Sequence, residues 1–502
     1  MDASASFPMV RDVPYMGVIW VVHEASKLGF RNGHPEWCNL GQGQPEVGDM
    51  PGAPARINSL SLSPSDHAYG PVGGTEEVRE AIADMVNRQY RRGRTKYTAD
   101  NVSFASGGRL ALTRLFTILA DGARIAYKNP DYTAYEDYLH SLRNRCVLLP
   151  MRAEEEHAFS IPAAQMENFI HQERADALVF SNPCNPTGEL ISGDTLERYV
   201  AAARRENCLL GSDEFYSHFI YEKDGSPANG PVSAAEFVED VDRDPVVIFD
   251  GLTKSHRYPG WRAGWAVGPR HIIEMLNRAA SAVDGGPSML TQRAALAALE
   301  PSRAEQETRA LRAEFAVKRR MMLEGLAAMG IRPAAEPRGT FYVWACIRDL
   351  PAPLDDADAF FHACLSRKSH DRARPILRCA SLPHPAGGGT LPLLGEILLW
   401  PVAGYSKNGA GTHCRPHSGK PLNTLRSRAG FRKKSPVFRR NPAHLLRSVT
   451  PQANYGHTGR REARRPQPQA QRASEHFRFE NALRSLALFD SAEHHNMPYL
   501  RK

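Results

Sequence analysis

The chain has 502 residues, of which 42% are hydrophobic and 24% are charged, and its formal net charge is +8. That length and apolar fraction suffice for one large α/β enzyme subunit or for two or more domains, and they exclude a chain that is disordered throughout. Residues 16–22 are apolar but too few to span a bilayer, and His23 and Glu24 follow them, so we expect no membrane span and an amphipathic N-terminal segment.

The eight cysteines are scattered, and no Cys-x-x-Cys pair occurs. Neither a disulfide framework nor a metal site is therefore predicted. This cysteine usage indicates a reducing, cytoplasmic compartment.

The positive charge is concentrated near the C-terminus. Residues 401–502 contain 20 Lys and Arg against 5 Asp and Glu, a net charge of +15, so residues 1–400 carry −7 of the overall +8. Basic clusters such as Arg432-Lys433-Lys434 can contact nucleic acid, but the tail has no basic helix, RNA-recognition motif or paired metal ligands. Nucleic acid is therefore not an expected partner.

Short apolar strands alternate with longer helical patterns from about residue 76 to 300, which predicts a mostly parallel, doubly wound α/β sheet. The predicted strands are residues 101–105, 124–127, 146–150, 177–181, 209–213, 246–250 and 264–268. A long helix is predicted at residues 301–328 and a short helix at 357–366. Residues 339–344 are predicted to be a strand of a second, smaller domain. After Lys368 the sequence is rich in Pro, Gly, Arg, His and Ser without a sustained period, which is typical of a loosely ordered tail.

Three motifs follow predicted strands, where open α/β sheets bind ligands. They are Asn185-Pro186-Thr187-Gly188, Asp213-Glu214-Phe215-Tyr216, and Lys254 with Arg262 eight residues later in Pro259-Gly260-Trp261-Arg262-Ala263-Gly264. Alone, the first string is typical of a turn, and a lysine after an apolar strand is usually a surface residue. Their order and spacing together favour a functional site.

This ordered set resembles the class I/II aminotransferases of the fold-type I pyridoxal-phosphate-dependent family, over about residues 40–368. The resemblance implies an α/β fold with a mostly parallel sheet in a large domain and a smaller α+β domain. The expected divisions are an N-terminal segment and arm at 1–60, the large cofactor domain at 61–300, the start of the small domain at 301–368, and an aberrant basic tail at 369–502. The implied cofactor is pyridoxal 5′-phosphate, and the implied substrates are an amino acid and a 2-oxo acid.

The resemblance also implies roles for single residues. Lys254 would form the Schiff base and later carry the α-proton, with Thr253 beside it in the cofactor site. Asp213 would pair with the pyridinium N–H and keep the ring an electron sink. Tyr216 and Asn185 would hydrogen-bond the phenolic oxygen, and Asn185 would also meet the substrate.

The phosphate is expected at the turn Ser106-Gly107-Gly108-Arg109, which opens a predicted helix at residues 110–119. Exposed backbone N–H groups and the helix dipole suit an anion there. In the resembling enzymes this turn holds the cofactor phosphate, and Arg262 would neutralise it.

Further positions rest on the resemblance. Tyr132 falls where the family stacks an aromatic ring on the pyridine, and Tyr69 falls where a tyrosine reaches the phosphate of the neighbouring subunit, which implies a homodimer. Single tyrosines are otherwise routine core residues. Gly43, in Gly41-Gln42-Gly43-Gln44-Pro45, matches the loop that approaches the substrate carboxylate; Pro45 and the absence of a following helical pattern argue against a dinucleotide loop.

The lysine loop departs from the family pattern. Gly251 stands where many relatives have a phosphate-binding serine, and Arg257 and Tyr258 are bulkier than usual. A lowered affinity for the cofactor is therefore expected, without loss of binding.

The family's late strand similar to Arg-Phe-Ser-Tyr-Gly, whose arginine binds the substrate carboxylate, is missing. A shift of reading frame near Lys368 explains its absence. With suitable codons, residues 369–379, 393–401 and 407–413 read one base later give V-M-T-V-P-G-R-F-F-D, S-W-V-R-F-S-Y-G and R-M-G-L-E-R-I, three blocks typical of the family and in the right order. We hypothesise that an inserted base or misplaced splice boundary changed the frame.

Three functions remain open from the sequence. An aminotransferase is expected first. A lyase, synthase or decarboxylase on the same scaffold is the second, because the cofactor site alone does not choose the reaction. A catalytically impaired remnant that binds the cofactor is the third, because the substrate arginine is missing.

Overall fold

The computed structural model describes residues 15, 17–31, 34, 37, 43–142 and 144–366. The predicted tail at 369–502, with its proposed shift of frame, lies outside this range. The described α-helices are α1 Gly17–Lys27, α2 Glu76–Tyr90, α3 Gly108–Ile118, α4 Thr133–Ser141, α5 Ala163–Glu173, α6 Asp194–Glu206, α7 Arg270–Val283, α8 Met289–Ala298, α9 Pro301–Ala328 and α10 Ala357–Ser366. The described strands are β1 Val102–Ala105, β2 Arg124–Asn129, β3 Val147–Arg152, β4 Ala177–Ser181, β5 Leu209–Asp213, β6 Val246–Gly251, β7 Gly264–Val267, β8 Arg332–Pro333 and β9 Ala345–Cys346.

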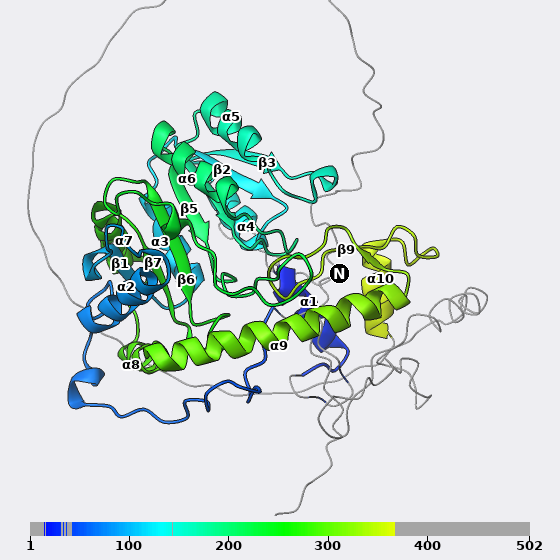
Figure 1. The fold of residues 1–502 in the computed structure, drawn as a ribbon, viewed down its shortest axis with the longest axis horizontal. Coiled ribbons are helices and arrows are strands. Elements are labelled where there is room, and N and C mark those ends of the chain that lie inside the picture. The colour runs from blue at the N-terminus through cyan, green and yellow to red at the C-terminus, as the bar shows by residue number, and fades with distance from the viewer. Residues whose placement is uncertain are drawn as a thin grey trace, which may run out of the picture. The chain divides into compact units, whose positions relative to one another are not determined.

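Seven strands form one sheet in the order β1-β7-β6-β5-β4-β2-β3 (Figure 1). The pairs β2–β3, β2–β4, β4–β5 and β5–β6 are parallel, and β7 runs antiparallel to both of its neighbours. The prediction of a mostly parallel α/β sheet is therefore confirmed. Each of the seven predicted strands is present, with ends that differ by no more than two residues.

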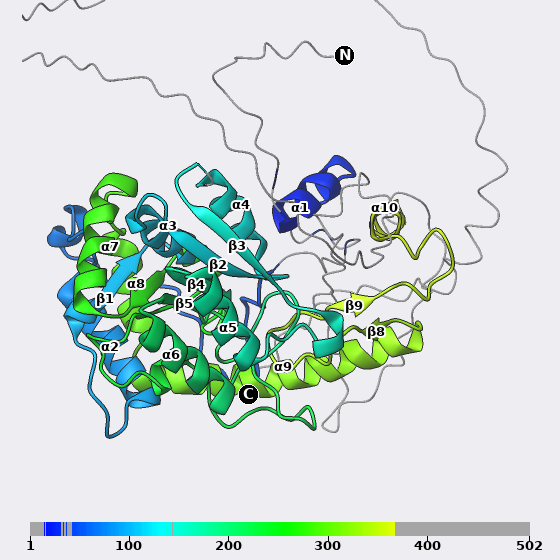
Figure 2. The same ribbon diagram turned by 90° about the horizontal axis from the view of Figure 1, so that it is seen from above.

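Both faces of this sheet are covered by helices, as the view from above shows (Figure 2). Successive residues of a strand point to opposite faces, and in β4 Leu178 and Phe180 join one apolar cluster while Ala177 and Val179 join the other. The first cluster includes buried side chains of α2, α5 and α6, and the second includes those of α3, α4 and α7. Such two-sided burial explains why the central strands are apolar at nearly every position.

The 28-residue helix α9 follows the large sheet, as the charged periodic run predicted. Helix α1 contacts α10 through Trp20 and Phe361, whose ring centroids lie 4.9 Å apart. Within the described part of the chain, no helix is both long and apolar enough to cross a membrane.

The predicted strand at 339–344 is wrong. The backbone bends at Thr340, whose φ is +64°, and regular pairing begins only at β9. In place of a neighbouring strand, the loops that follow β4 and β5 accept hydrogen bonds from this backbone. The Thr340 N–H donates to the Phe219 carbonyl, and the Gly339 N–H donates to the Gly188 carbonyl. As a result the 339–343 segment runs beside the strand ends that carry the predicted functional residues.

Candidate active site

Five segments with predicted site residues follow the carboxyl ends of sheet strands. Gly107 follows β1, Tyr132 follows β2, Asn185 follows β4, Asp213 ends β5 and Lys254 follows β6. The adjacent order of β6, β5, β4 and β2 places four of these segments along one edge of the sheet. Ligands bind at this edge in open α/β folds.

The Lys254 amine is half-buried and donates a hydrogen bond to the carbonyl of Gly43. The rings of Tyr216 and Phe341 flank it, each with its centroid 5.2 Å from Nζ. Segments from the N-terminal region, the sheet and the 339–343 segment therefore converge on this one nitrogen. An amine held among aromatic faces and one carbonyl is oriented for chemistry more than an exposed lysine would be.

Asp213 is buried and accepts a 2.6 Å hydrogen bond from the hydroxyl of Tyr135. Burial raises the pKa of this carboxyl to about 6, although the Tyr135 hydroxyl, the Phe215 N–H and the Lys254 charge each lower it. A carboxylate destabilised by burial gains most from a cationic N–H partner. Asp213 is thus suited to hold a protonated ring nitrogen.

Tyr216 is also buried, and its hydroxyl lies 2.7 Å from that of Tyr342, within hydrogen-bond distance. The ring of Tyr216 packs edge-on against Phe219 and Phe341 as well. Tyr342 belongs to the bent 339–343 segment, so this pair joins that segment to the sheet.

A cradle of glycines lies where α3 begins. Gly107 has φ +97°, and a methyl group there would come within 3.0 Å of Cζ of Arg262. A methyl on Gly264 would lie 2.6 Å from the backbone nitrogen of Gly108. The absence of side chains lets an exposed arginine and the free N–H groups of a helix N-terminus meet, which is a fitting site for a phosphate.

Arg109 and Tyr132 contact each other at the rim of this cradle. The Arg109 Nε donates to the Tyr132 hydroxyl at 3.0 Å, and the Tyr132 ring is edge-on to Tyr135 at 5.5 Å. Tyr132 is thereby held from both ends.

A buried network fixes the loops that carry Tyr132 and Asn185. The Asp131 carboxylate accepts hydrogen bonds from the N–H of Tyr132 at 2.6 Å, and from the N–H of Ser181 at 3.0 Å and its hydroxyl. The Ser181 hydroxyl in turn accepts from the N–H of Asn185 at 3.0 Å. One carboxylate thus sets the positions of two predicted ligand-binding residues, neither of which touches it through its side chain.

Gly251 leaves no room for the serine that many of the resembling enzymes have at this position. A methyl group there would overlap the Ala263 carbonyl and lie 2.8 Å from both Gly264 Cα and Cε1 of Phe215. A methyl on Gly108 would overlap the same Phe215 ring. Phe215 therefore fills the space between the two glycines.

Arg257 is buried, with φ +57°, and points toward α9. Its Nε pairs with the Glu307 carboxylate at 2.6 Å, and its Nη1 donates to the carbonyls of Glu46 and Gly48 at 3.0 and 2.8 Å. Tyr258 stacks on Trp261 with centroids 3.7 Å apart. The bulk that the sequence placed in the lysine loop is accommodated by packing against α9 and the N-terminal segment.

Two predicted residues stand apart. Tyr69 is fully exposed, and Thr253 is half-buried beside Lys254. Sequence reasoning in turn missed Tyr135, Asp131, Ser181 and Tyr342. Tyr135 carried a signal, because it follows Tyr132 by about one helical turn.

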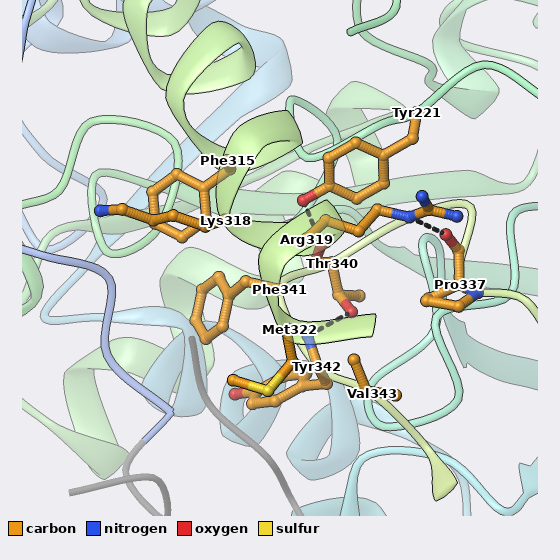
Figure 3. Close-up of a pocket in the computed structure, with 10 residues that line it drawn as sticks. All are labelled: Tyr221, Phe315, Lys318, Arg319, Met322, Pro337, Thr340, Phe341, Tyr342 and Val343. Atoms are coloured by element: carbon orange, nitrogen blue, oxygen red, sulfur yellow. Dashed lines mark hydrogen bonds between the residues drawn. The ribbon is translucent and has the colours of Figure 1, made fainter. Parts of the chain in front are cut away.

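A separate small cavity lies between α9 and the 337–343 segment (Figure 3). Its volume is about 20 Å³, enough for roughly one water molecule. Tyr342 and Met322 are among the residues that line it (Figure 3). An amino acid does not fit this cavity, so it is not the substrate site.

Comparison with known proteins agrees with this geometry. The aspartate/prephenate aminotransferase of Thermus thermophilus is 28% identical over 328 residues, which cover 64% of this chain and 80% of that protein. The arginine–pyruvate transaminase of Pseudomonas aeruginosa is 30% identical over 351 residues, covering 69% and 84%. The crystal structure of an aminotransferase from Mycobacterium tuberculosis superposes with a TM-score of 0.58 at 26% identity, covering 71% of this chain and 87% of that one. The family model for aminotransferase class I and II matches residues 35–375, and this chain belongs to that family.

Proposed function

We propose that this chain binds pyridoxal 5′-phosphate and uses it to move an amino group between an amino acid and a 2-oxo acid. One observation carries the proposal: an oriented amine, a buried carboxylate and a glycine cradle with an arginine lie at one edge of the sheet. The amine can react with the cofactor's aldehyde, the carboxylate can pair with its ring nitrogen, and the cradle with the arginine can hold its phosphate. When bound, the cofactor supplies an aldehyde that takes up the amino group and a ring that accepts electrons.

The phosphate would be held by the N–H groups of Gly108 and Arg109, with Gly107 lining the cradle and Arg262 supplying the positive charge. The Gly107 N–H itself donates to the Ala105 carbonyl. The cradle fits this group because a side chain at Gly107 or Gly264 would occupy the space where guanidinium and backbone meet. Gly251 contributes no hydroxyl, so we infer that Arg262 and the helix carry most of the binding.

The ring would lie against Tyr132, with its nitrogen on Asp213 and its phenolic oxygen between Asn185 and Tyr216. Asp213 holds the proton on the ring nitrogen, since a cation there relieves the cost of its buried charge. Asn185 and Tyr216 each offer a donor to an anionic oxygen.

Lys254 attaches the cofactor and moves the proton at the substrate's α-carbon, with Thr253 beside it. Its hydrogen bond to Gly43 places the amine at the loop expected to meet the substrate. Gly43 and Asn185 would contact the substrate carboxylate.

We propose a homodimer in which Tyr69 reaches the phosphate of the partner's site. Tyr69 is fully exposed, and the exposed leucines Leu60 and Leu62 lie close to it in the sequence, which supports a contact surface there. Within each subunit, residues 1–60 form the N-terminal segment and arm, 61–300 the large domain and 301–368 the start of the small one. We propose a cytoplasmic location, which the free cysteines among the described residues support.

The decisive experiment is chemical trapping on the purified protein. Addition of pyridoxal phosphate should produce visible absorbance, and borohydride should fix the cofactor on Lys254, as located by peptide mass. In a separate sample without borohydride, incubation with amino acids should convert the cofactor to its amine form, and 2-oxoglutarate should then return it to the aldehyde form. A Lys254→Ala variant that still yields the trapped adduct would refute the assignment. An adduct without amino transfer, in a protein whose frame is restored after Lys368, would refute the activity.

A further inference from the structure

Tyr342 lies where three segments meet near Lys254. It is 3% exposed, and its hydroxyl is 2.7 Å from that of Tyr216. A methyl group on Gly43 would overlap the same hydroxyl. Gly43 is also the residue whose carbonyl accepts from the Lys254 amine.

We propose that Tyr342 is a positioning residue of the reaction, acting through Tyr216. Its hydroxyl donates to the Tyr216 oxygen and so orients and strengthens the hydrogen bond that Tyr216 gives to the cofactor's phenolic oxygen. This inference rests on the proposed function, because it requires the cofactor to lie against Tyr216.

Counting protons sets the direction of the pair. Each phenol has one proton to donate. An anionic phenolic oxygen takes the proton of Tyr216 as its hydrogen bond, so the proton shared by the two tyrosines belongs to Tyr342. Successive hydrogen bonds of this kind polarise one another, by roughly 10–30% per bond.

The predicted consequence is a shift in the pKa of the nitrogen that links Lys254 to the cofactor. When that nitrogen is protonated, it shares its proton with the phenolic oxygen. When it loses the proton, the oxygen depends on protein donors. Donation from Tyr216, strengthened by Tyr342, therefore favours the deprotonated state and lowers this pKa.

The test is an absorbance titration of the cofactor-loaded full chain against pH. Tyr216→Phe should raise the pKa of the linkage by about 1–2 units, since it removes a hydrogen bond to a charged oxygen. Tyr342→Phe should raise it by a smaller amount, about 0.3–0.7 unit. Only an oxygen atom is removed in each case, so the packed rings remain.

Tyr221→Phe is the matched control. Tyr221 is equally buried and its hydroxyl donates at 2.8 Å to the Thr340 carbonyl, in the same segment as Tyr342 but outside the site (Figure 3). Its titration should match that of the unmodified protein. An equal shift in Tyr221→Phe and Tyr342→Phe would mean that the segment was merely loosened, and would overturn the proposal.

The double variant Tyr216→Phe/Tyr342→Phe tests whether Tyr342 acts through Tyr216. Its pKa should equal that of Tyr216→Phe alone, as coupled residues require. A further shift in the double variant would mean that Tyr342 acts on the cofactor directly. A Tyr342→Phe titration that superimposes on that of the unmodified protein would also overturn the proposal. Failure of the proposed function itself is distinguishable, because the borohydride adduct on Lys254 would then not form at all.

Discussion

At the scale of single residues, Asp213 places stability and function in opposition. Its folded-state pKa of about 6 exceeds the ordinary value of 3.8 because the carboxyl is buried. The folded protein without cofactor therefore holds this proton more tightly than the unfolded chain. Stability from this group is fully present at low pH and is lost as the pH rises from about 4 to about 6.

We predict that Asp213→Asn stabilises the cofactor-free protein. Above pH 6 its free energy of unfolding should exceed that of the unmodified protein by up to roughly 3 kcal/mol, from the cited shift at about 1.4 kcal/mol per unit. The difference should vanish near pH 4, while amino transfer is largely lost at every pH. Urea unfolding at pH 4, 5, 6 and 7.5 measures it, and a difference independent of pH would contradict the explanation.

At the scale of elements, Arg257 joins the lysine loop to α9 and to the N-terminal segment at residues 46–48. Glu307 also pairs with Arg56 at 3.0 Å. These buried charges fix the register of three segments that are distant in sequence. Lys254 lies three residues before Arg257, so the same contacts help to fix the position of its amine.

Arg257→Met should destabilise the protein by about 3 kcal/mol, at the lower end for breaking a buried pair, because Arg56 still compensates Glu307. The matched control is Arg309→Met. Arg309 lies on α9 and pairs with Glu305 of the same helix, and because both side chains are exposed, this pair should contribute little to the free energy of unfolding. Thermal and urea unfolding of the cofactor-free proteins compare them. An equal decrease in the free energy of unfolding of both variants would show that the buried Arg257–Glu307 pair stabilises the protein no more than the exposed pair does.

The sheet was predictable from sequence because its strands are short, apolar and buried on both faces. The bounds of β4 and β5 were predicted to the residue, and α9 was predicted from its charged periodicity. The 339–344 strand failed because its aromatic residues are placed by loops, with the Gly188 and Phe219 carbonyls taking the backbone N–H groups. Local pattern carries no information about such long-range partners.

The same limit applies to the site. Lys254, Asp213 and Asn185 could be proposed from motifs because they follow strands in a fixed order. The partners that orient them, Tyr135 and Ser181, depend on which loops become neighbours in space. The direction of Arg257 was likewise unpredictable, since its partner Glu307 lies 50 residues later.

At the scale of the whole molecule, the proposed change of frame after Lys368 determines whether this chain is active. The family match ends at residue 375, shortly after that point. With suitable codons, the frame read one base later encodes the arginine expected to bind the substrate carboxylate, whereas the chain as written lacks the strand that would carry it.

We predict that a gene with the frame restored after Lys368 yields a soluble dimer that transaminates. The chain as written should be poorly soluble, with kcat/KM lower by roughly two to four orders of magnitude, because losing one partner of a buried charge pair costs about 3–5 kcal/mol. Size-exclusion chromatography and coupled assays compare the two proteins, and DNA sequencing across the Lys368 codon tests the origin. Equal activity, or tail peptides from an uninterrupted frame, would contradict this account.

The contact of Phe215 with Gly108 and Gly251 has an evolutionary consequence. Serine at 251 would meet the Phe215 ring, the Ala263 carbonyl and Gly264 at once. A smaller residue at 215 would remove only the ring contact and would leave a void, whereas the Ala263 carbonyl and Gly264 would still block serine at 251. Because backbone atoms block position 251, we expect descendants of this sequence to strengthen phosphate binding through Arg262 or the helix N-terminus more readily than to regain the hydroxyl. Selection from a library randomised at 215 and 251 should therefore return no serine at 251, whatever the side chain at 215.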